Sequence, residues 1–164
     1  MAGLPRVAVT IGDPCGIGPE VVVKALATPE VLNSINVVLV GSTEVVQATA
    51  KQLQSPFRLV RLTTLDEAVY DPDTLPVLDI IDFDVSSVRP GRLSVESGRA
   101  SVEWVLQAGR LAIANEVDAI ATAPINKEAA RLAGYTEVGH MELLQTLSGA
   151  SKVATMLVSG KLRV

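Results

Sequence analysis

Short apolar strands alternate with helical segments along this chain, and that alternation restricts its possible folds more than any other feature. Runs of β-branched and aliphatic residues predict buried strands at 6–11, 37–40, 57–62 and 77–81. Turn and capping residues predict helices over about 20–27 and 44–53, and a loop with one helical turn over 64–75. We interpret Asp79, Asp82 and Asp84 as a solvated strand end. The alternation favours an α/β fold, in which a mostly parallel sheet is flanked by helices.

The longest predicted helix covers about residues 97–115 and has a wide apolar surface. Its two apolar rows contain Val102, Val105, Leu106, Gly109, Ala112 and Ile113, and Trp104, Ala108 and Leu111. Packing between a sheet and neighbouring helices explains such a surface, and burial of part of it against a second subunit is the alternative. The pattern then predicts a strand at 118–122, a short helix from Asn126, a helix at 140–147, a buried strand at 153–158, and the start of another at 162–164.

The composition argues against several classes of function. The chain has 164 residues, enough for one domain, and a net charge of -4 without clusters of Lys and Arg, so it lacks a nucleic-acid footprint. No apolar run approaches the roughly 20 residues of a membrane span. The single cysteine, Cys15, cannot form an internal disulfide, which fits a reducing compartment. We therefore expect a soluble cytoplasmic protein that binds neither nucleic acid nor membrane.

A glycine-rich turn at residues 12–20 follows the first predicted strand. Its glycine spacing differs from the dinucleotide fingerprint G-x-G-x-x-G, and it lacks the Lys-Ser/Thr of a Walker loop. Pro19 removes an N–H that a phosphate would use, and Glu20 and Asp13 add negative charge, so the turn is a poor anion site. We interpret it as a segment that shapes the backbone or meets a hydroxyl, amine or cation. Cys15 is interpreted as a small filler.

A second polar group follows the 118–122 strand and contains Thr122, Asn126, Lys127 and His140, the only histidine. Asn126 is a good helix N-cap, whereas the lysine charge opposes the helix dipole there. Lys127 could fix a phosphate or carboxylate, and His140 could donate a hydrogen bond or act as an acid or base. A surface lysine and a hydrogen-bonded loop histidine remain the alternative. One histidine and Cys15 do not make a transition-metal site.

Taken together, these motifs resemble the 4-hydroxythreonine-4-phosphate dehydrogenase family of vitamin B6 (pyridoxal phosphate) biosynthesis. Residues 9–21, 122–127 and 139–142 are similar to three signatures of that family in the right order, and residues 90–94 and 97–98 also fit. The resemblance implies a fold like the isocitrate and isopropylmalate dehydrogenases, in a homodimer. It also implies NAD- or NADP-dependent oxidation, with decarboxylation, of 4-phosphohydroxy-L-threonine at a divalent metal, which is zinc, magnesium or cobalt.

The resemblance further implies that residues 1–164 are the N-terminal portion of a chain about twice as long. The family's metal ligands and nicotinamide contacts lie in the C-terminal portion, so we expect no metal ligand here and no activity from these residues alone. We expect substrate contacts at His140 and Met141, and further pocket residues at Asp13, Asn126 and Lys127.

Met141 departs from the family pattern, which usually has a threonine at this position. Methionine offers only a weak acceptor sulfur in place of a hydroxyl. A related dehydrogenase of a sugar-acid phosphate or an aromatic dihydrodiol is therefore an alternative. An alternative of another class is a truncated, non-catalytic binding module.

Overall fold

A parallel β-sheet forms the centre of the computed structural model, which describes residues 3–71 and 73–164. Its strands are β1 (Arg6–Thr10), β2 (Asn36–Val40), β3 (Arg58–Leu62), β4 (Thr74–Leu78) and β5 (Ala119–Thr122). They lie in the order β3-β4-β2-β1-β5, and every neighbouring pair is parallel. The α/β fold with a parallel sheet is thus confirmed.

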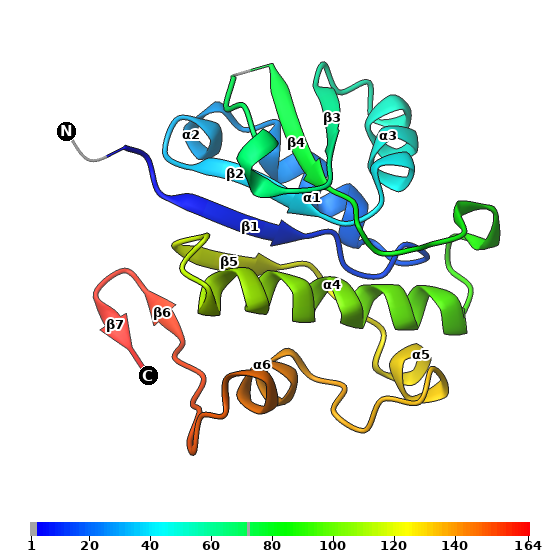
Figure 1. The fold of residues 1–164 in the computed structure, drawn as a ribbon, viewed down its shortest axis with the longest axis vertical. Helices are drawn as coiled ribbons and strands as arrows, with labels where there is room; N and C mark the ends of the chain where they lie inside the picture. The colour runs from blue at the N-terminus through cyan, green and yellow to red at the C-terminus, as the bar shows by residue number, and fades with distance from the viewer. Residues whose placement is uncertain (1–2, 72) are drawn as a thin grey trace.

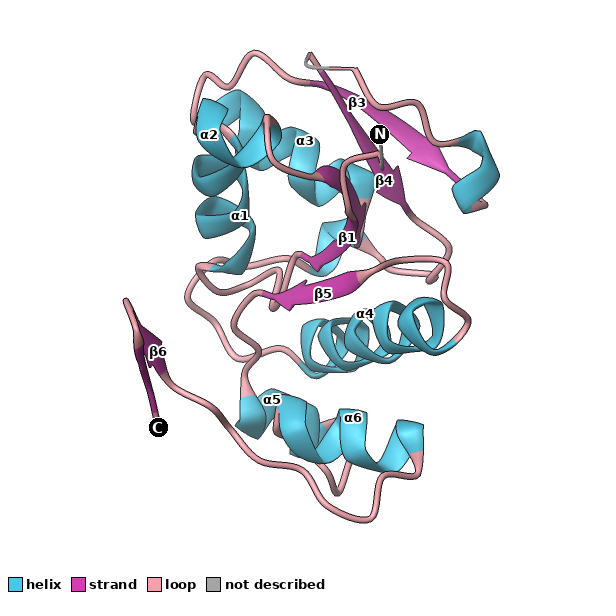
Figure 2. Cartoon of the chain, turned by 90° about the vertical axis from the view of Figure 1, so that its left-hand side faces the viewer, coloured by secondary structure: helices cyan, strands magenta, loops and turns pink. Residues whose placement is uncertain are grey.

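Helices cover both faces of the sheet (Figures 1 and 2). One face carries α1 (Gly18–Leu26), α2 (Pro29–Leu32) and α3 (Thr43–Gln52). The other carries α4 (Val95–Ile113), and α5 (Lys127–Leu132) and α6 (His140–Ser148) pack against the far side of α4. Two short 3₁₀ turns, η1 (Leu65–Glu67) and η2 (Val85–Ser87), lie in the connections. None of the helices that the structure describes combines the length and apolar character that a membrane crossing needs.

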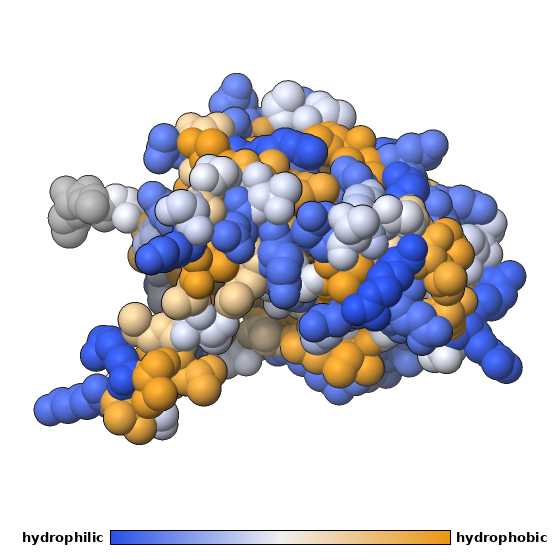
Figure 3. Space-filling model, turned by 90° about the horizontal axis from the view of Figure 1, so that it is seen from below, coloured by the Kyte–Doolittle hydropathy of each residue, from blue (hydrophilic) through white to orange (hydrophobic). Residues whose placement is uncertain are grey.

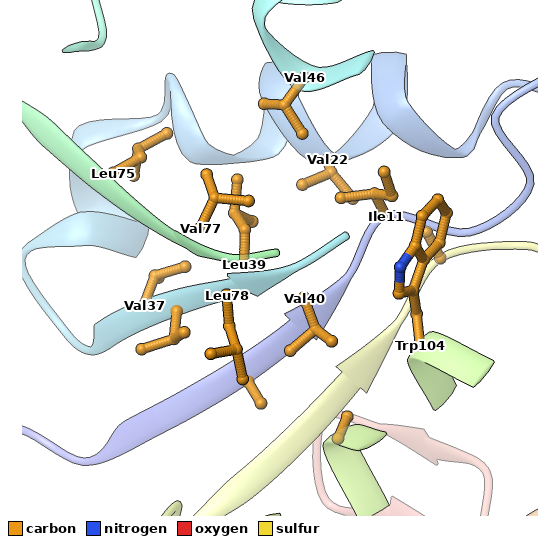
Figure 4. Packing of buried hydrophobic residues seen from close by; sticks show 14 of the residues in the cluster. Ile11, Val22, Val37, Leu39, Val40, Val46, Leu75, Val77, Leu78 and Trp104 are labelled. Atoms are coloured by element: carbon orange, nitrogen blue, oxygen red, sulfur yellow. The ribbon is translucent and has the colours of Figure 1, made fainter. Parts of the chain in front are cut away.

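The core explains the wide apolar surface of α4. One row, with Trp104 and Ala108, is buried against the sheet, where Trp104 lies near Ile11 (Figure 4). The other row, with Val102 and Val105, packs in a second cluster with residues of α5 and α6. Packing within the chain therefore accounts for most of both rows, whereas Ile113 remains 54% exposed.

Two element boundaries and one helix differ from the sequence prediction. β4 runs from Thr74 to Leu78 rather than over 77–81, and it continues through Pro76, which pairs with Val60. α4 begins earlier than residue 97 because Ser94 caps it by accepting a hydrogen bond from the Ser97 N–H. The single-turn helix α2 was not predicted from the sequence, because four residues give no helical periodicity.

The predicted buried strand at 153–158 is wrong. Residues 151–157 have no regular structure, and β6 (Val158–Ser159) pairs antiparallel with β7 (Leu162–Arg163) in a small hairpin. Every residue from 151 to 164 is exposed, and the hairpin projects from the body of the molecule (Figures 1 and 3). The segment has a strand-like composition, but its residues are exposed and it does not join the central sheet.

Asp79 is not part of a solvated strand end. It is buried, and its Oδ2 accepts a hydrogen bond from the Thr43 N–H at 2.8 Å, at the start of α3. Arg61 Nε lies 3.4 Å from the same oxygen. Asp82 and Asp84 are exposed, as predicted.

Candidate functional site

Parallel pairing of β1 and β5 brings the two sequence motifs together. Thr10 and Thr122 are partners at the carboxyl ends of these strands. Beyond them, the Ala123 N–H donates to the Thr10 carbonyl at 3.2 Å, and the Asp13 N–H donates to the Pro124 carbonyl at 2.9 Å. The loops after both strands are therefore tied together at the edge where open α/β sheets bind ligands.

Two glycines allow this close approach. Gly12 has a φ of +72°, and a Cβ at this position would overlap the Pro124 carbonyl oxygen. A Cβ on Gly18 would overlap the Ile11 carbonyl oxygen. The interpretation that the 12–20 turn shapes the backbone is confirmed.

The tied loops form an open hollow with a volume of about 470 Å³. It is lined by Asp13, Gly16, Ile17, Pro124, Ile125, Asn126 and Lys127. The three residues expected in a pocket, Asp13, Asn126 and Lys127, thus lie around one space. The sequence analysis did not select Ile17 or Ile125. A large apolar residue within the glycine-rich turn was a signal that could have selected Ile17, which is 64% exposed in the structure.

Asp13 is a buried carboxyl group at the wall of the hollow. Its Oδ1 accepts a hydrogen bond from the Cys15 N–H at 2.8 Å. Burial raises the pKa of Asp13 above its ordinary value of 3.8, and the hydrogen bond from Cys15 opposes that shift. Cys15 is itself buried, with its Sγ 3.1 Å from Ser97 Oγ, as expected for a small filler.

Asn126 and Lys127 form the start of α5. The Asn126 Oδ1 accepts hydrogen bonds from the backbone N–H groups of Glu128 and Ala129, at 3.0 and 3.1 Å, so the predicted N-cap is confirmed. The Lys127 side chain is exposed at the hollow, and among the described residues no ion pair includes it. Its ammonium group is therefore free to meet an anion.

His140 is the first residue of α6 and is half-buried; it does not line the hollow, but it lies close enough to Lys127 for the lysine charge to act on it. Burial lowers the pKa of His140 from 6.5, the charge of Lys127 acts in the same direction, and the Ala123 backbone and Glu142 oppose the shift. Its Nε2 is shielded from solvent and has no hydrogen-bond partner among the described residues. A mostly neutral imidazole with an unpartnered nitrogen can donate a hydrogen bond to a ligand or accept one.

Met141 does not line the hollow. Its side chain is exposed, and its sulfur lies 2.6 Å from the Thr155 hydroxyl oxygen. The structure therefore brings together Asp13, Asn126 and Lys127, places His140 beside them, and leaves Met141 outside this group.

These residues do not assemble a metal or nicotinamide site. Within residues 3–71 and 73–164, no group of three or more His, Cys, Asp or Glu side chains could hold a metal ion. The turn after β1 lacks the dinucleotide fingerprint, and Pro19 and Glu20 make its helix start unsuited to a pyrophosphate. The side chains that line the hollow offer a cation at Lys127 and a carboxyl group at Asp13.

Comparison with known proteins agrees with this fold. Residues 33–164 match the family model of the pyridoxal phosphate biosynthetic protein PdxA. A Fusobacterium nucleatum protein, provisionally named D-threonate 4-phosphate dehydrogenase, is 33% identical over 159 residues, which cover 97% of this chain and 48% of the relative. The chain thus spans about half the length of that relative.

Two crystal structures show how far the similarity extends. A 4-hydroxythreonine-4-phosphate dehydrogenase from Burkholderia phymatum is 33% identical, with a TM-score of 0.92, and the match covers 99% of this chain and 49% of that protein. A terephthalate 1,2-cis-dihydrodiol dehydrogenase from Burkholderia xenovorans is 28% identical, with a TM-score of 0.64 over 81% of this chain and 38% of that protein. The chain belongs to the PdxA family of dehydrogenases and aligns with their N-terminal half.

Proposed function

We propose that this chain is the N-terminal portion of an NAD(P)-dependent, metal-requiring dehydrogenase of vitamin B6 biosynthesis. The substrate is 4-phosphohydroxy-L-threonine, which is oxidised at its hydroxyl group and decarboxylated. The enzyme works as a cytoplasmic homodimer with a divalent metal, which is zinc, magnesium or cobalt. Membership of the PdxA family supports the reaction class, and the C-terminal portion supplies the metal ligands and nicotinamide contacts.

The observation that carries this proposal is the hollow between the two tied loops. Lys127 offers a positive charge for an anionic group of the substrate, and it lies close enough to His140 to lower the pKa of that imidazole. Asp13, on the opposite motif, offers a carboxyl group for a hydroxyl or amine. A small molecule with an anionic end and several hydroxyl or amino groups fits this set of side chains.

The role of this half of the enzyme is to bind and orient the substrate. Asn126 fixes the backbone that carries Lys127, and the His140 imidazole holds a substrate oxygen. Met141 lies outside the hollow, so its contact with the substrate requires a part of the bound molecule that extends beyond the hollow. Holding the substrate in one orientation lowers the activation free energy of its oxidation, because the reacting groups are already in the required geometry.

A coupled assay on the protein that includes the C-terminal portion tests the proposal. Reduction of NAD or NADP is followed with 4-phosphohydroxy-L-threonine and each divalent metal in turn. We expect turnover that a chelator abolishes and added metal restores. Absence of reduction with this and every related phosphorylated hydroxy acid would refute the proposal.

D-threonate 4-phosphate is the second candidate substrate. This chain is 33% identical both to a relative named for D-threonate 4-phosphate and to a crystallised 4-hydroxythreonine-4-phosphate dehydrogenase, so identity does not separate the two. Met141 favours this candidate, because the residue has no hydroxyl with which to bind the usual substrate. The ratio of kcat/KM for the two compounds decides between them.

An aromatic dihydrodiol is a less favoured substrate, because it gives Lys127 no phosphate and the matching structure has the lower TM-score, 0.64. A non-catalytic binding module is the alternative of another class. The reading frame after Val164 tests it: continuation into a metal-binding C-terminal portion supports the enzyme, and a stop codon supports the module.

A further inference from the structure

Helix α4 carries two glycines, and each faces one of the two short helices that begin with a candidate site residue. Gly98 faces α5, which begins with Lys127. Gly109, three turns further along, faces α6, which begins with His140. The two contacts differ in what a larger residue would meet.

Gly98 lies directly against the backbone of α5. A Cβ on Gly98 would overlap the backbone carbonyl group of Ala129 and lie 2.8 Å from the Ala129 Cβ. A Cβ on Gly109 would instead meet the terminal Cδ2 atoms of Leu147 and Leu144, at 2.5 and 2.9 Å. Leucine ends can change rotamer, whereas a helix backbone can give way only if the whole helix moves.

The backbone that Gly98 contacts is the same backbone that carries the candidate site. Ala129 is two residues from Lys127, and its N–H donates to the Asn126 cap at 3.1 Å. α5 has only six residues, so it moves as a unit. Its start faces Asp13 across the hollow, and the Asp13–Pro124 hydrogen bond fixes the opposite wall.

We propose that Gly98 is a positioning residue of the substrate site, because its missing side chain lets α5 approach α4 closely enough to place Lys127 opposite Asp13. This inference rests on the proposed function of the hollow. An added methyl group moves α5 outward by roughly 1 Å before ordinary van der Waals contact is restored. A displacement of this size moves the Lys127 side chain away from the position in which it contacts the bound substrate, which weakens substrate binding.

Gly98→Ala, with Gly109→Ala as the matched control, tests the proposal in the protein that includes the C-terminal portion. We expect Gly98→Ala to raise the KM of the phosphorylated substrate about tenfold or more, with kcat within about threefold of wild type, as for a lost binding contact. The inhibition constant of inorganic phosphate should rise by a similar factor. Gly109→Ala should change each value less than about twofold.

Combination with Lys127→Gln separates positioning from general damage. If Gly98 acts through Lys127, Gly98→Ala should add little to the KM of Lys127→Gln. The emission of the only tryptophan, Trp104, reports the α4 core and should be unchanged in both glycine variants. If the wild-type protein shows turnover but the two glycine variants have equal KM values, this inference alone is overturned. The same holds if the effects of Gly98→Ala and Lys127→Gln on KM are fully additive. Absence of wild-type turnover removes the proposed function, and this inference with it.

Ala129→Gly keeps the proposal testable if Gly98→Ala does not fold. A Cβ on Gly98 would lie closer to the Ala129 backbone than to the Ala129 methyl group, so Ala129→Gly should change KM less than about twofold. For the same reason, it should not restore the KM of a folded Gly98→Ala variant. A large change in KM, or restoration, contradicts the proposed contact.

Discussion

Lys127 is the residue on which the proposed binding role depends most directly. It is exposed at the hollow, in the first turn of α5, where its charge is unfavourable for the helix dipole. The Asn126 cap stabilises the same turn through two hydrogen bonds. The helix therefore keeps a cation at its start, and an anionic ligand would offset this local cost.

Lys127→Gln should weaken substrate binding while leaving the fold intact. A hydrogen bond to a charged group contributes about 1.5–3 kcal/mol, and exposure places this one near the lower limit, so we expect KM to rise about tenfold. Lys51→Gln, at an exposed position in α3, is the control and should leave KM unchanged. Steady-state kinetics with both phosphorylated substrates provide the measurement. Equal KM values for the two variants would argue against a bound phosphate or carboxylate at Lys127.

His140 should make the stability of the protein depend on pH near neutrality. Its folded pKa is lowered from 6.5, so between the two values the unfolded chain binds a proton that the folded chain does not. The free energy of unfolding is therefore fully retained above about pH 6.5 and falls as the pH drops through this window.

Urea unfolding of wild type and His140→Gln at pH 7.5 and pH 5.5 measures this effect. We expect the wild-type midpoint to fall more than that of the variant, because the chain has no other histidine. An equal fall in both proteins would show that burial does not hold His140 neutral.

Met141→Thr tests which phosphorylated acid is the substrate. If 4-phosphohydroxy-L-threonine is the natural one, a restored hydroxyl should add a hydrogen bond of about 0.5–1.5 kcal/mol and lower KM by a few-fold to tenfold. The KM for D-threonate 4-phosphate in the same variant serves as the comparison. An unchanged or higher KM for the amino acid phosphate would count against that assignment.

The site could be predicted from the sequence only in part. Residue types and spacing indicated Asn126 and Lys127, because a polar loop after a strand of a parallel sheet is a common ligand site, whereas Asp13 was expected in the pocket only from the family resemblance. The unpartnered Nε2 of His140 and the exposure of Met141 depend on contacts between segments far apart in the chain. Such contacts leave no periodic pattern in a single sequence.

Among the elements, the start of helix α3 is stabilised by a carboxylate that follows strand β4. Asp79 follows β4, is buried, and accepts the Thr43 N–H, while Ser42 accepts the Val45 N–H at 3.4 Å. Asp79→Ala would leave a backbone donor and Arg61 without this partner. The start of the helix is therefore held from outside its own sequence.

Asp79→Ala should lower the free energy of unfolding by about 1–3 kcal/mol, as expected for the loss of a buried hydrogen-bond acceptor at a helix start. Asp82→Ala, at an exposed position nearby, should change it by less than about 0.5 kcal/mol. Thermal or urea unfolding of both variants gives the comparison. A similar small loss in each would mean that Asp79 behaves as a solvated carboxylate after all.

The element predictions succeeded where local signals and packing agreed. β1, β2 and α3 follow their hydrophobic patterns and caps closely. β4 was predicted too late: it begins at Thr74 and includes Pro76, although proline has no N–H to give to a sheet. The segment 153–158 has the composition of a buried strand, but it is exposed. Composition alone does not show whether another element packs against a segment.

At the scale of the whole molecule, substrate binding and oxidation are expected to require different portions of the polypeptide. The described residues contain no group of three side chains for a metal ion, so a protein of these 164 residues should show no turnover with any metal. The longer protein should show turnover in the same coupled assay. Metal-dependent reduction of NAD or NADP by the 164 residues alone would contradict this division.

The β6–β7 hairpin has a practical consequence for anyone who handles these residues in isolation. Met156, Leu157, Leu162 and Val164 each expose more than 60% of their surface on this projecting arm. Contact between two such arms would release water from these side chains, so the protein should aggregate in concentrated solution and scatter light. Replacing Leu157 and Leu162 with serine should keep those solutions clear.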